Sequence, residues 1–166
     1  MRVVIPWAPG PREYHELVAR VLRADGLEPE PVRLDDNLAY GRLLVELWEA
    51  HETFVVIEHD IIPWPWAVDS MLRCANHWCR YPYRQHGGYA AGFGCMKIEG
   101  SLADQYPRLV AEVAARDAHP WPAGDWRIID VVIDMELRRR GVEPHEHLPG
   151  VAHLSARLKP YRRTTT

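Results

Sequence analysis

The chain has 166 residues, of which 47% are hydrophobic and 26% charged, and its formal net charge is −3. These values are ordinary for a soluble globular protein, and we expect one domain over residues 1–166. No apolar run reaches the ~18 residues that a membrane span needs, which excludes a membrane-spanning helix. The cysteine count is odd and no secretion signal is recognisable, which predicts reduced thiols and a cytoplasmic protein.

The first part of the sequence alternates between predicted strands and helices. Residues 2–7 and 31–34 are short apolar runs that predict strands, and residues 13–24 and 38–50 have the apolar spacing of amphipathic helices. Residues 54–57 are a third strand-like run. The resulting β-α-β-α-β order implies right-handed crossovers and a parallel sheet.

The third run is the most informative stretch of the chain. Its four residues, Phe-Val-Val-Ile, are typical of a strand that is buried on both faces, and they lead directly into Glu58, His59 and Asp60. Ligands of open α/β sheets bind at the carboxyl ends of strands, and two carboxylates with an imidazole offer ligands to Mg²⁺ or Mn²⁺. The alternative is that the acids begin an exposed loop and that Asp60 caps the next helix.

The second part of the chain is less regular. The expected elements are helices over residues 64–74, 101–118 and 126–140 and a strand over residues 93–98. Pro107 lies near the start of the second of these helices or breaks it. Asp125 is a plausible N-cap of the third, and Gly141 ends it. Glycine, aromatic residues and histidine dominate residues 75–95, where we expect loops and short strands.

Two further groups of side chains could take part in chemistry. Asp130 lies off the centre of the apolar stripe of its helix, and a carboxylate that faces a cleft can act as general base for an acceptor hydroxyl. Asp125 is the second candidate, although an N-cap role explains it more simply. The late histidines His145, His147 and His153 could complete a metal site or could be packing residues.

Cysteine and histidine also gather between residues 74 and 95. A structural zinc site made from Cys74, His77, Cys79, His86 and Cys95 is an alternative for this segment, but Cys-x4-Cys beside a predicted helix is not a strong spacing. The sequence contains no phosphate loop, nucleophile elbow or dinucleotide fingerprint.

The order of strands and helices, with an acidic motif at the end of a buried strand, resembles the GT-A glycosyltransferases. In that family an Asp-x-Asp-like motif holds a divalent metal and the diphosphate of a sugar nucleotide, and Glu58-His59-Asp60 is similar to it. The segments His147-Leu-Pro-Gly and Lys159-Pro160-Tyr161 look like the His-x-x-Gly and Lys-Pro-aromatic ending of some retaining members, at a different spacing. The resemblance implies a GT-A-like (Rossmann-like) three-layer α/β/α sandwich with a mostly parallel central sheet.

The resemblance also implies roles for individual residues. Residues 1–62 would form a nucleotide-binding half, and residues 63–166 a half that completes the metal site and binds the acceptor. The donor nucleotide would be held by Pro6, Trp7, Asp35, Asp36 and Arg42, the Mn²⁺ or Mg²⁺ by Asp60, Glu58, His153 and His147, and the acceptor would face Asp130 or Asp125.

The activity implied is metal-dependent transfer of a sugar from a nucleoside-diphosphate sugar to an acceptor hydroxyl. Some small GT-A-like enzymes of bacteriophages modify hydroxymethylated cytosine in DNA, which implies such DNA as an acceptor and the host cytoplasm as location. The basic end of the chain fits a phosphate-bearing partner, with Arg157, Lys159, Arg162 and Arg163. The alternatives are a metal-dependent nucleotide hydrolase or nucleotidyltransferase and a non-catalytic nucleic-acid-binding module.

Overall fold

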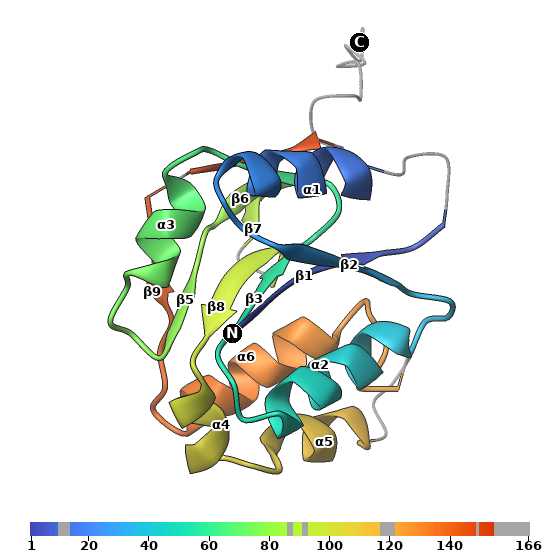
Figure 1. Ribbon diagram of the computed structural model, residues 1–166. Coiled ribbons are helices and arrows are strands. Elements are labelled where there is room, and N and C mark those ends of the chain that lie inside the picture. The colour runs from blue at the N-terminus through green and yellow to red at the C-terminus, as the bar shows by residue number, and fades with distance from the viewer. Residues whose placement is uncertain (10–13, 86–87, 91–92, 117–121, 149, 155–166) are drawn as a thin grey trace, which may run out of the picture.

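A computed structural model of the chain describes residues 1–9, 14–85, 88–90, 93–116, 122–148 and 150–154 (Figure 1). Its centre is a six-stranded sheet with the order β2-β1-β3-β8-β5-β9. The strands are β1 (Arg2–Trp7), β2 (Pro29–Arg33), β3 (Phe54–Ile57), β5 (Trp78–Arg80), β8 (Cys95–Ile98) and β9 (His145–Glu146). Strand β8 is antiparallel to both of its neighbours, β3 and β5, and the remaining pairs are parallel. The sheet is therefore mixed and mostly parallel, as expected.

Helices cover both faces of this sheet, so the fold has three layers (Figure 1). Helices α1 and α3 lie on one face, and α2, α4, α5 and α6 lie on the other. Their bounds are α1 (His15–Ala24), α2 (Ala39–Glu49), α3 (Ala67–Leu72), α4 (Gly100–Gln105), α5 (Leu109–Ala114) and α6 (Ile129–Arg139). No helix in the described part of the chain is long and apolar enough to cross a membrane.

Strand β3 shows why the sequence needs a continuous apolar run at this point. Successive side chains of a strand point to opposite faces. Phe54 and Val56 belong to the core that contains α2 and α6, whereas Val55 and Ile57 belong to the core that contains α1 and α3. All four residues are buried. The prediction of a strand buried on both faces is confirmed.

Two small sheets complete the fold. Strand β4 (Ile61–Pro63) pairs antiparallel with β10 (Val151–His153), and β6 (Tyr83–Gln85) pairs antiparallel with β7 (Gly88–Ala90). In the first of these sheets His153 is the register partner of Ile61. The pairing carries the late part of the chain to the end of β3, where Glu58 and Asp60 lie.

Two sequence predictions about helices are corrected by the structure. The single helix expected over residues 101–118 is two helices, because Pro107 lacks an N–H group and disfavours the helical conformation in the residue before it. Tyr106 accordingly has φ −132° and ψ 61°. The helix expected from Trp126 begins at Ile129, and its N-cap position is Ile128. Asp125 is therefore not its N-cap.

The start of α2 and the segment before α6 approach each other closely. A Cβ atom on Gly41 would lie 2.4 Å from the carbonyl oxygen of Gly124, so only glycine fits at this point of α2. The backbone N–H of Trp126 donates to the carbonyl oxygen of Asn37 at 2.9 Å. These contacts place the first residues of α6 beside the loop that follows β2.

Candidate functional site

A cleft of about 640 Å³ lies at the carboxyl ends of β1, β2 and β3. Its walls come from the three loops that follow these strands and from two residues of the second half of the chain. They are Pro6, Trp7, Ala8, Pro9, Leu34, Asp35, Asp36, Asn37, Tyr40, Glu58, His59, Asp60, Trp126 and His153. Parallel strands present their carboxyl ends at one edge of a sheet, which is where open α/β folds bind ligands. The parallel order expected for the first three strands thus brings their following loops to one edge.

Asp60 and His153 meet on one side of this cleft. The imidazole Nε2 of His153 lies 3.4 Å from a carboxylate oxygen of Asp60, and the backbone N–H of Leu154 donates to the carbonyl oxygen of Asp60 at 2.8 Å. The His153 ring is stacked on Tyr83, with the ring centroids 5.3 Å apart, and is almost fully buried. The antiparallel pairing of β4 with β10 thus joins residues that are far apart in the sequence.

Glu58 lies in an unfavourable place for a negative charge. Burial, together with the nearby charges of Asp130 and Asp60, raises its pKa to about 8. Burial also raises the pKa of Asp130 above its ordinary value. Three carboxyl groups thus lie near one another, and none of the described residues that line the cleft is lysine or arginine. The two neighbouring negative charges disfavour ionisation of Glu58 unless a cation offsets them.

Asp130 is fixed at the first turn of α6. One carboxylate oxygen accepts a hydrogen bond from the backbone N–H of Val131 at 2.8 Å, and the other lies 3.4 Å from the backbone N–H of Phe93. Asp130 is not part of the cleft wall, but its charge acts on Glu58, Tyr40 and Tyr83. It therefore lies outside the cleft wall but close enough for its charge to raise the pKa of Glu58.

Asp125, the other predicted acceptor-side acid, has a different environment. Its side chain is only 3% exposed, and its two oxygens accept hydrogen bonds from the guanidinium of Arg127 at 2.8 and 3.0 Å and from the backbone N–H of Arg127 at 3.0 Å. These bonds tie down the turn that leads into α6. Both oxygens of Asp125 are thus engaged within the protein.

The predicted nucleotide-binding residues are brought together at the other end of the cleft. Pro6 and Trp7 end β1, and the indole of Trp7 stacks on the His15 ring at a centroid distance of 3.9 Å. Asp35 and Asp36 follow β2. Arg42 does not line the cleft, because its exposed guanidinium is held by Asp36 at 2.8 Å.

Asp35 is paired in a similar way. One of its carboxylate oxygens lies 2.8 Å from Nε of Arg33, the last residue of β2. The acids of this loop are thus compensated by neighbouring arginines, unlike Glu58 and Asp60. The loop offers a planar aromatic ring together with carboxylate and amide groups, which are suited to a base and to ribose hydroxyls.

Two aromatic residues of the cleft wall, Tyr40 and Trp126, were not among the predicted site residues. Tyr40 reads as part of the apolar stripe of α2, yet it lines the cleft, and its buried hydroxyl finds no hydrogen-bond partner among the described residues. Trp126 is 54% exposed and joins the cleft from the loop before α6. No local signal distinguishes either residue from core or surface aromatic residues. A buried hydroxyl without a partner is costly, which favours a bound polar group at this point.

Several predicted residues lie elsewhere. His147 does not line the cleft; its ring stacks on Tyr81 at 4.7 Å and lies near Cys74 and Cys79. The Lys159-Pro160-Tyr161 segment and the basic end of the chain fall outside the described residues, as does His86.

The donor set of the cleft fits a hard divalent cation. Carboxylate oxygens are the protein ligands that Mg²⁺ prefers and Mn²⁺ accepts, and an imidazole suits Mn²⁺ as well. Glu58, Asp60 and His153 supply this combination within one wall. The repulsion between the carboxylates would be relieved by such an ion.

Comparisons with known proteins support the fold. No protein-family model matches the chain, and no curated protein matches it. Among solved structures, it is similar to a glycosyltransferase involved in the glycosylation of the major capsid of PBCV-1, with a TM-score of 0.55 and 11% identity over 92% of this chain and 93% of that one. It is also similar to A197 from STIV, with a TM-score of 0.53 and 11% identity over 89% of this chain and 82% of that one. The chain has a GT-A-like α/β/α fold.

Proposed function

We propose that this chain is a metal-dependent glycosyltransferase that moves a sugar from a nucleoside-diphosphate sugar to an acceptor hydroxyl. The observation that carries the proposal is the charge of the cleft. Among the residues that the structure describes, four acids and no lysine or arginine line it, with Asp130 close behind. A diphosphate is itself negative and would be repelled by such a wall, so its binding requires a divalent cation between them. The similarity in fold to a viral glycosyltransferase supports the same reading.

The donor would lie along the ends of the three parallel strands. Trp7, next to Pro6, would stack on the base, and Asp35 and Asp36 with Asn37 would accept hydrogen bonds from the ribose. Glu58, Asp60 and His153 would hold Mn²⁺ or Mg²⁺. That ion, when bound, would neutralise the diphosphate as a Lewis acid and so improve it as a leaving group. Arg42 would contribute only if it left Asp36.

The acceptor would approach from the side of α6. In the reaction, the bond between the anomeric carbon and the diphosphate oxygen breaks, and the diphosphate leaves with the bonding electrons. The anomeric carbon forms a new bond to the acceptor oxygen, whose proton passes to a carboxylate. We assign this proton to Asp130, because burial raises its pKa and so makes it a stronger base than an ordinary aspartate. Among the described residues its oxygens meet only backbone N–H groups, whereas Asp125 is ion-paired with the guanidinium of Arg127.

The test is a release assay in which the purified chain is incubated with nucleoside-diphosphate sugars of different bases and with Mn²⁺, Mg²⁺ or EDTA. Simple sugars, peptides and DNA carrying hydroxymethylcytosine serve as acceptors. We expect one base to support nucleoside diphosphate release only with metal, and we expect an acceptor to increase the rate and to gain the mass of the sugar. Release of nucleoside monophosphate, or of pyrophosphate from a nucleoside triphosphate, would contradict the proposal and indicate hydrolysis or nucleotidyl transfer.

A further inference from the structure

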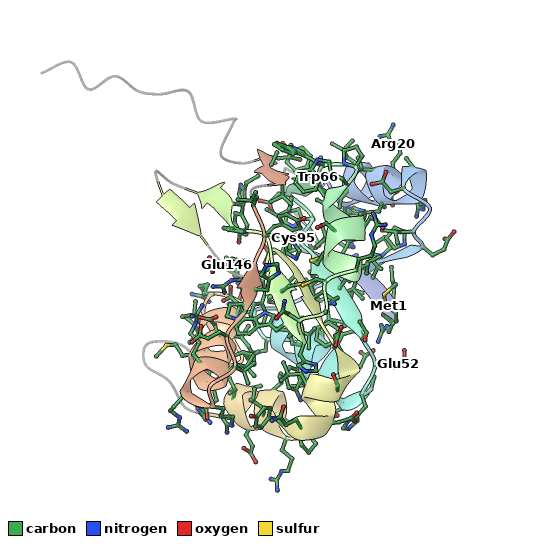
Figure 2. All side chains as sticks on the ribbon, turned by 90° about the vertical axis from the view of Figure 1, so that its left-hand side faces the viewer. Met1, Arg20, Glu52, Trp66, Cys95 and Glu146 are labelled. Carbon is green, nitrogen blue, oxygen red and sulfur yellow. The ribbon has the colours of Figure 1, made fainter. Side chains whose placement is uncertain are left out.

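A second group of metal-ligating side chains lies outside the cleft, at the β9 edge of the sheet. It consists of Cys74, just after α3, Cys79 on β5, and His147, just after β9. Figure 2 faces this edge and shows Glu146 on β9 and Cys95 farther inside. Strands β5 and β9 are parallel neighbours in which Cys79 is the register partner of His145. The fold thus joins two segments that are more than 60 residues apart in the sequence.

The geometry of this group is that of a metal site. One ligand atom each of Cys74, Cys79 and His147 lies within 4.8 Å of the others. Nδ1 of His145 lies 3.2 Å from Sγ of Cys74, and the rings of His145 and His147 meet edge to face at a centroid distance of 4.6 Å. Tetrahedral zinc with sulfur and nitrogen ligands at about 2.0–2.3 Å places its ligand atoms about 3.5 Å apart. Small side-chain movements would close the group to that size.

The surroundings of His147 point to a ligand. Its Nε2 is buried and has no hydrogen-bond partner among the described residues, while its Nδ1 lies 3.4 Å from the hydroxyl of Ser70. Imidazoles that bind metal usually donate their other ring N–H to an oxygen, which fixes the tautomer. Ser70 provides that oxygen, which leaves the lone pair of Nε2 for a metal.

The sulfur atoms have matching surroundings. The side-chain amide of Asn76 donates to Sγ of Cys74 at 3.4 Å, as expected for a site that stabilises a thiolate. The thiol of Cys79 makes only a long contact of 3.6 Å with the carbonyl oxygen of Met71, so its sulfur has no strong hydrogen bond to give up to a metal. Lys97 is almost fully buried nearby, but its charge is paired with Glu99 at 3.0 Å.

We infer that Cys74, Cys79, His147 and His145 form a structural zinc site that fastens β9 to β5 and to the end of α3. Two thiolates and two neutral imidazoles give a neutral complex with Zn²⁺, and four protein ligands close the coordination shell, as in structural sites. Strand β9 has only two residues, so a metal link to β5 would stabilise its position in the sheet. A disulfide between Cys74 and Cys79 would account for the two sulfur atoms but not for the unpartnered nitrogen of His147.

The experiment measures zinc in the full chain, purified from zinc-supplemented medium without chelator. We expect about one zinc per chain in the wild type and less than about a tenth of that in Cys79→Ser and in His147→Ala. Cys95→Ala is the matched control, since Cys95 is the third cysteine, is buried in β8 and lies outside the group. It should retain the zinc. Chelation should lower the melting temperature of the wild type by about 5 °C.

A second measurement covers the case in which the variants do not fold. Cobalt is added to wild-type chain whose zinc has been removed, and the visible spectrum is recorded. We expect an intense d–d absorption and a sulfur-to-cobalt charge-transfer band, which report tetrahedral coordination by thiolate. Folded wild-type chain that binds neither zinc nor cobalt would overturn the inference. So would a Cys74–Cys79 disulfide in chain purified under reducing conditions, or equal loss of zinc in Cys95→Ala.

Discussion

The cleft and the cysteine–histidine group lie at different edges of the same sheet and have opposite chemistry. The cleft offers carboxylate oxygens and one imidazole, and it opens to a volume of about 640 Å³. The other group offers the sulfur atoms of Cys74 and Cys79 and a ring nitrogen of His147, with His145 beside Cys74. Hard oxygen sites with free positions suit Mg²⁺ or Mn²⁺ and a phosphate ligand, whereas closed sulfur and nitrogen sites suit zinc. If both proposals hold, this small fold separates a metal used for chemistry from a metal used for stability.

The Asp60→Asn variant tests most directly whether the cleft holds its own metal, and it has the largest expected effect. Asp60 contacts His153 and lies directly before β4. Its loss should therefore remove the metal from the cleft. We expect metal-dependent donor turnover to fall at least about 100-fold, with an unchanged melting temperature and unchanged zinc content. Asp25→Asn, in the exposed turn after α1, is the control. Wild-type turnover in Asp60→Asn would refute the metal assignment of the cleft.

The Glu58→Gln variant tests the repulsion within the cleft through the pH dependence of the free energy of unfolding. Because the pKa of Glu58 is raised to about 8 in the folded chain, the folded state must retain a proton that the unfolded state loses above about pH 4.5. The wild type should therefore lose stability relative to Glu58→Gln as the pH rises from about 4.5 to 8, by up to about 5 kcal/mol. Urea unfolding in EDTA measures this. Excess Mn²⁺ should stabilise only the wild type, and equal curves for the two proteins at every pH would show that Glu58 is not repelled.

Glu136 is the opposite of Glu58, because arginine side chains balance the charge of its carboxylate. It is buried on α6 and pairs with Arg116, Arg139 and Arg140, and Arg116 contributes most to lowering its pKa to about 2. A lowered pKa stabilises the fold above about pH 4.5, and this stability is lost as the pH falls toward 2. We expect Glu136→Gln to destabilise the chain by about 1 kcal/mol at pH 7, because the arginines remain solvated. The difference should shrink at pH 3, and a stabilising effect at pH 7 would contradict this account.

The smallest expected effect tests whether the two regions are independent. His153 is carried to the cleft by the pairing of β10 with β4, which does not involve the cysteine–histidine group. Cys79→Ser should therefore leave the Mn²⁺-dependent affinity for the donor within about threefold, which is less than 1 kcal/mol. Calorimetric titration at a temperature at which the variant is folded measures this. A tenfold loss would show that the two sites are coupled.

Local patterns predicted much of the fold and one side of the site. The apolar run of β3, the two crossover helices and the acids that follow β3 are all contiguous in the sequence, so their periodicity and order place them at one edge of a parallel sheet. The break at Pro107 was visible as an alternative, because proline acts on its own neighbours. His153 was named as a candidate, but only the β4–β10 pairing places it beside Asp60.

The remainder depends on contacts between distant segments. Strand β9 has two residues and exists because it pairs with β5, so no periodicity could indicate it or the approach of His147 to Cys79. Tyr40 has the sequence position of a core residue on α2, and the burial of its hydroxyl in the cleft depends on the packing of α6. Asp125 was expected at an N-cap, but α6 begins at Ile129 and the side chain of Asp125 pairs with Arg127.

The measurement that tests the central claim most directly is thermal stability in the presence of nucleoside diphosphates and their sugars, with and without Mn²⁺. A ligand that binds only the folded chain, at about 100 times its dissociation constant, adds roughly 2.7 kcal/mol to the free energy of unfolding. The account predicts a clear shift for one base only, which requires Mn²⁺ and disappears in Asp60→Asn. An equal shift without metal, or no shift with any nucleotide while DNA stabilises the chain, would contradict a metal-dependent sugar-nucleotide site.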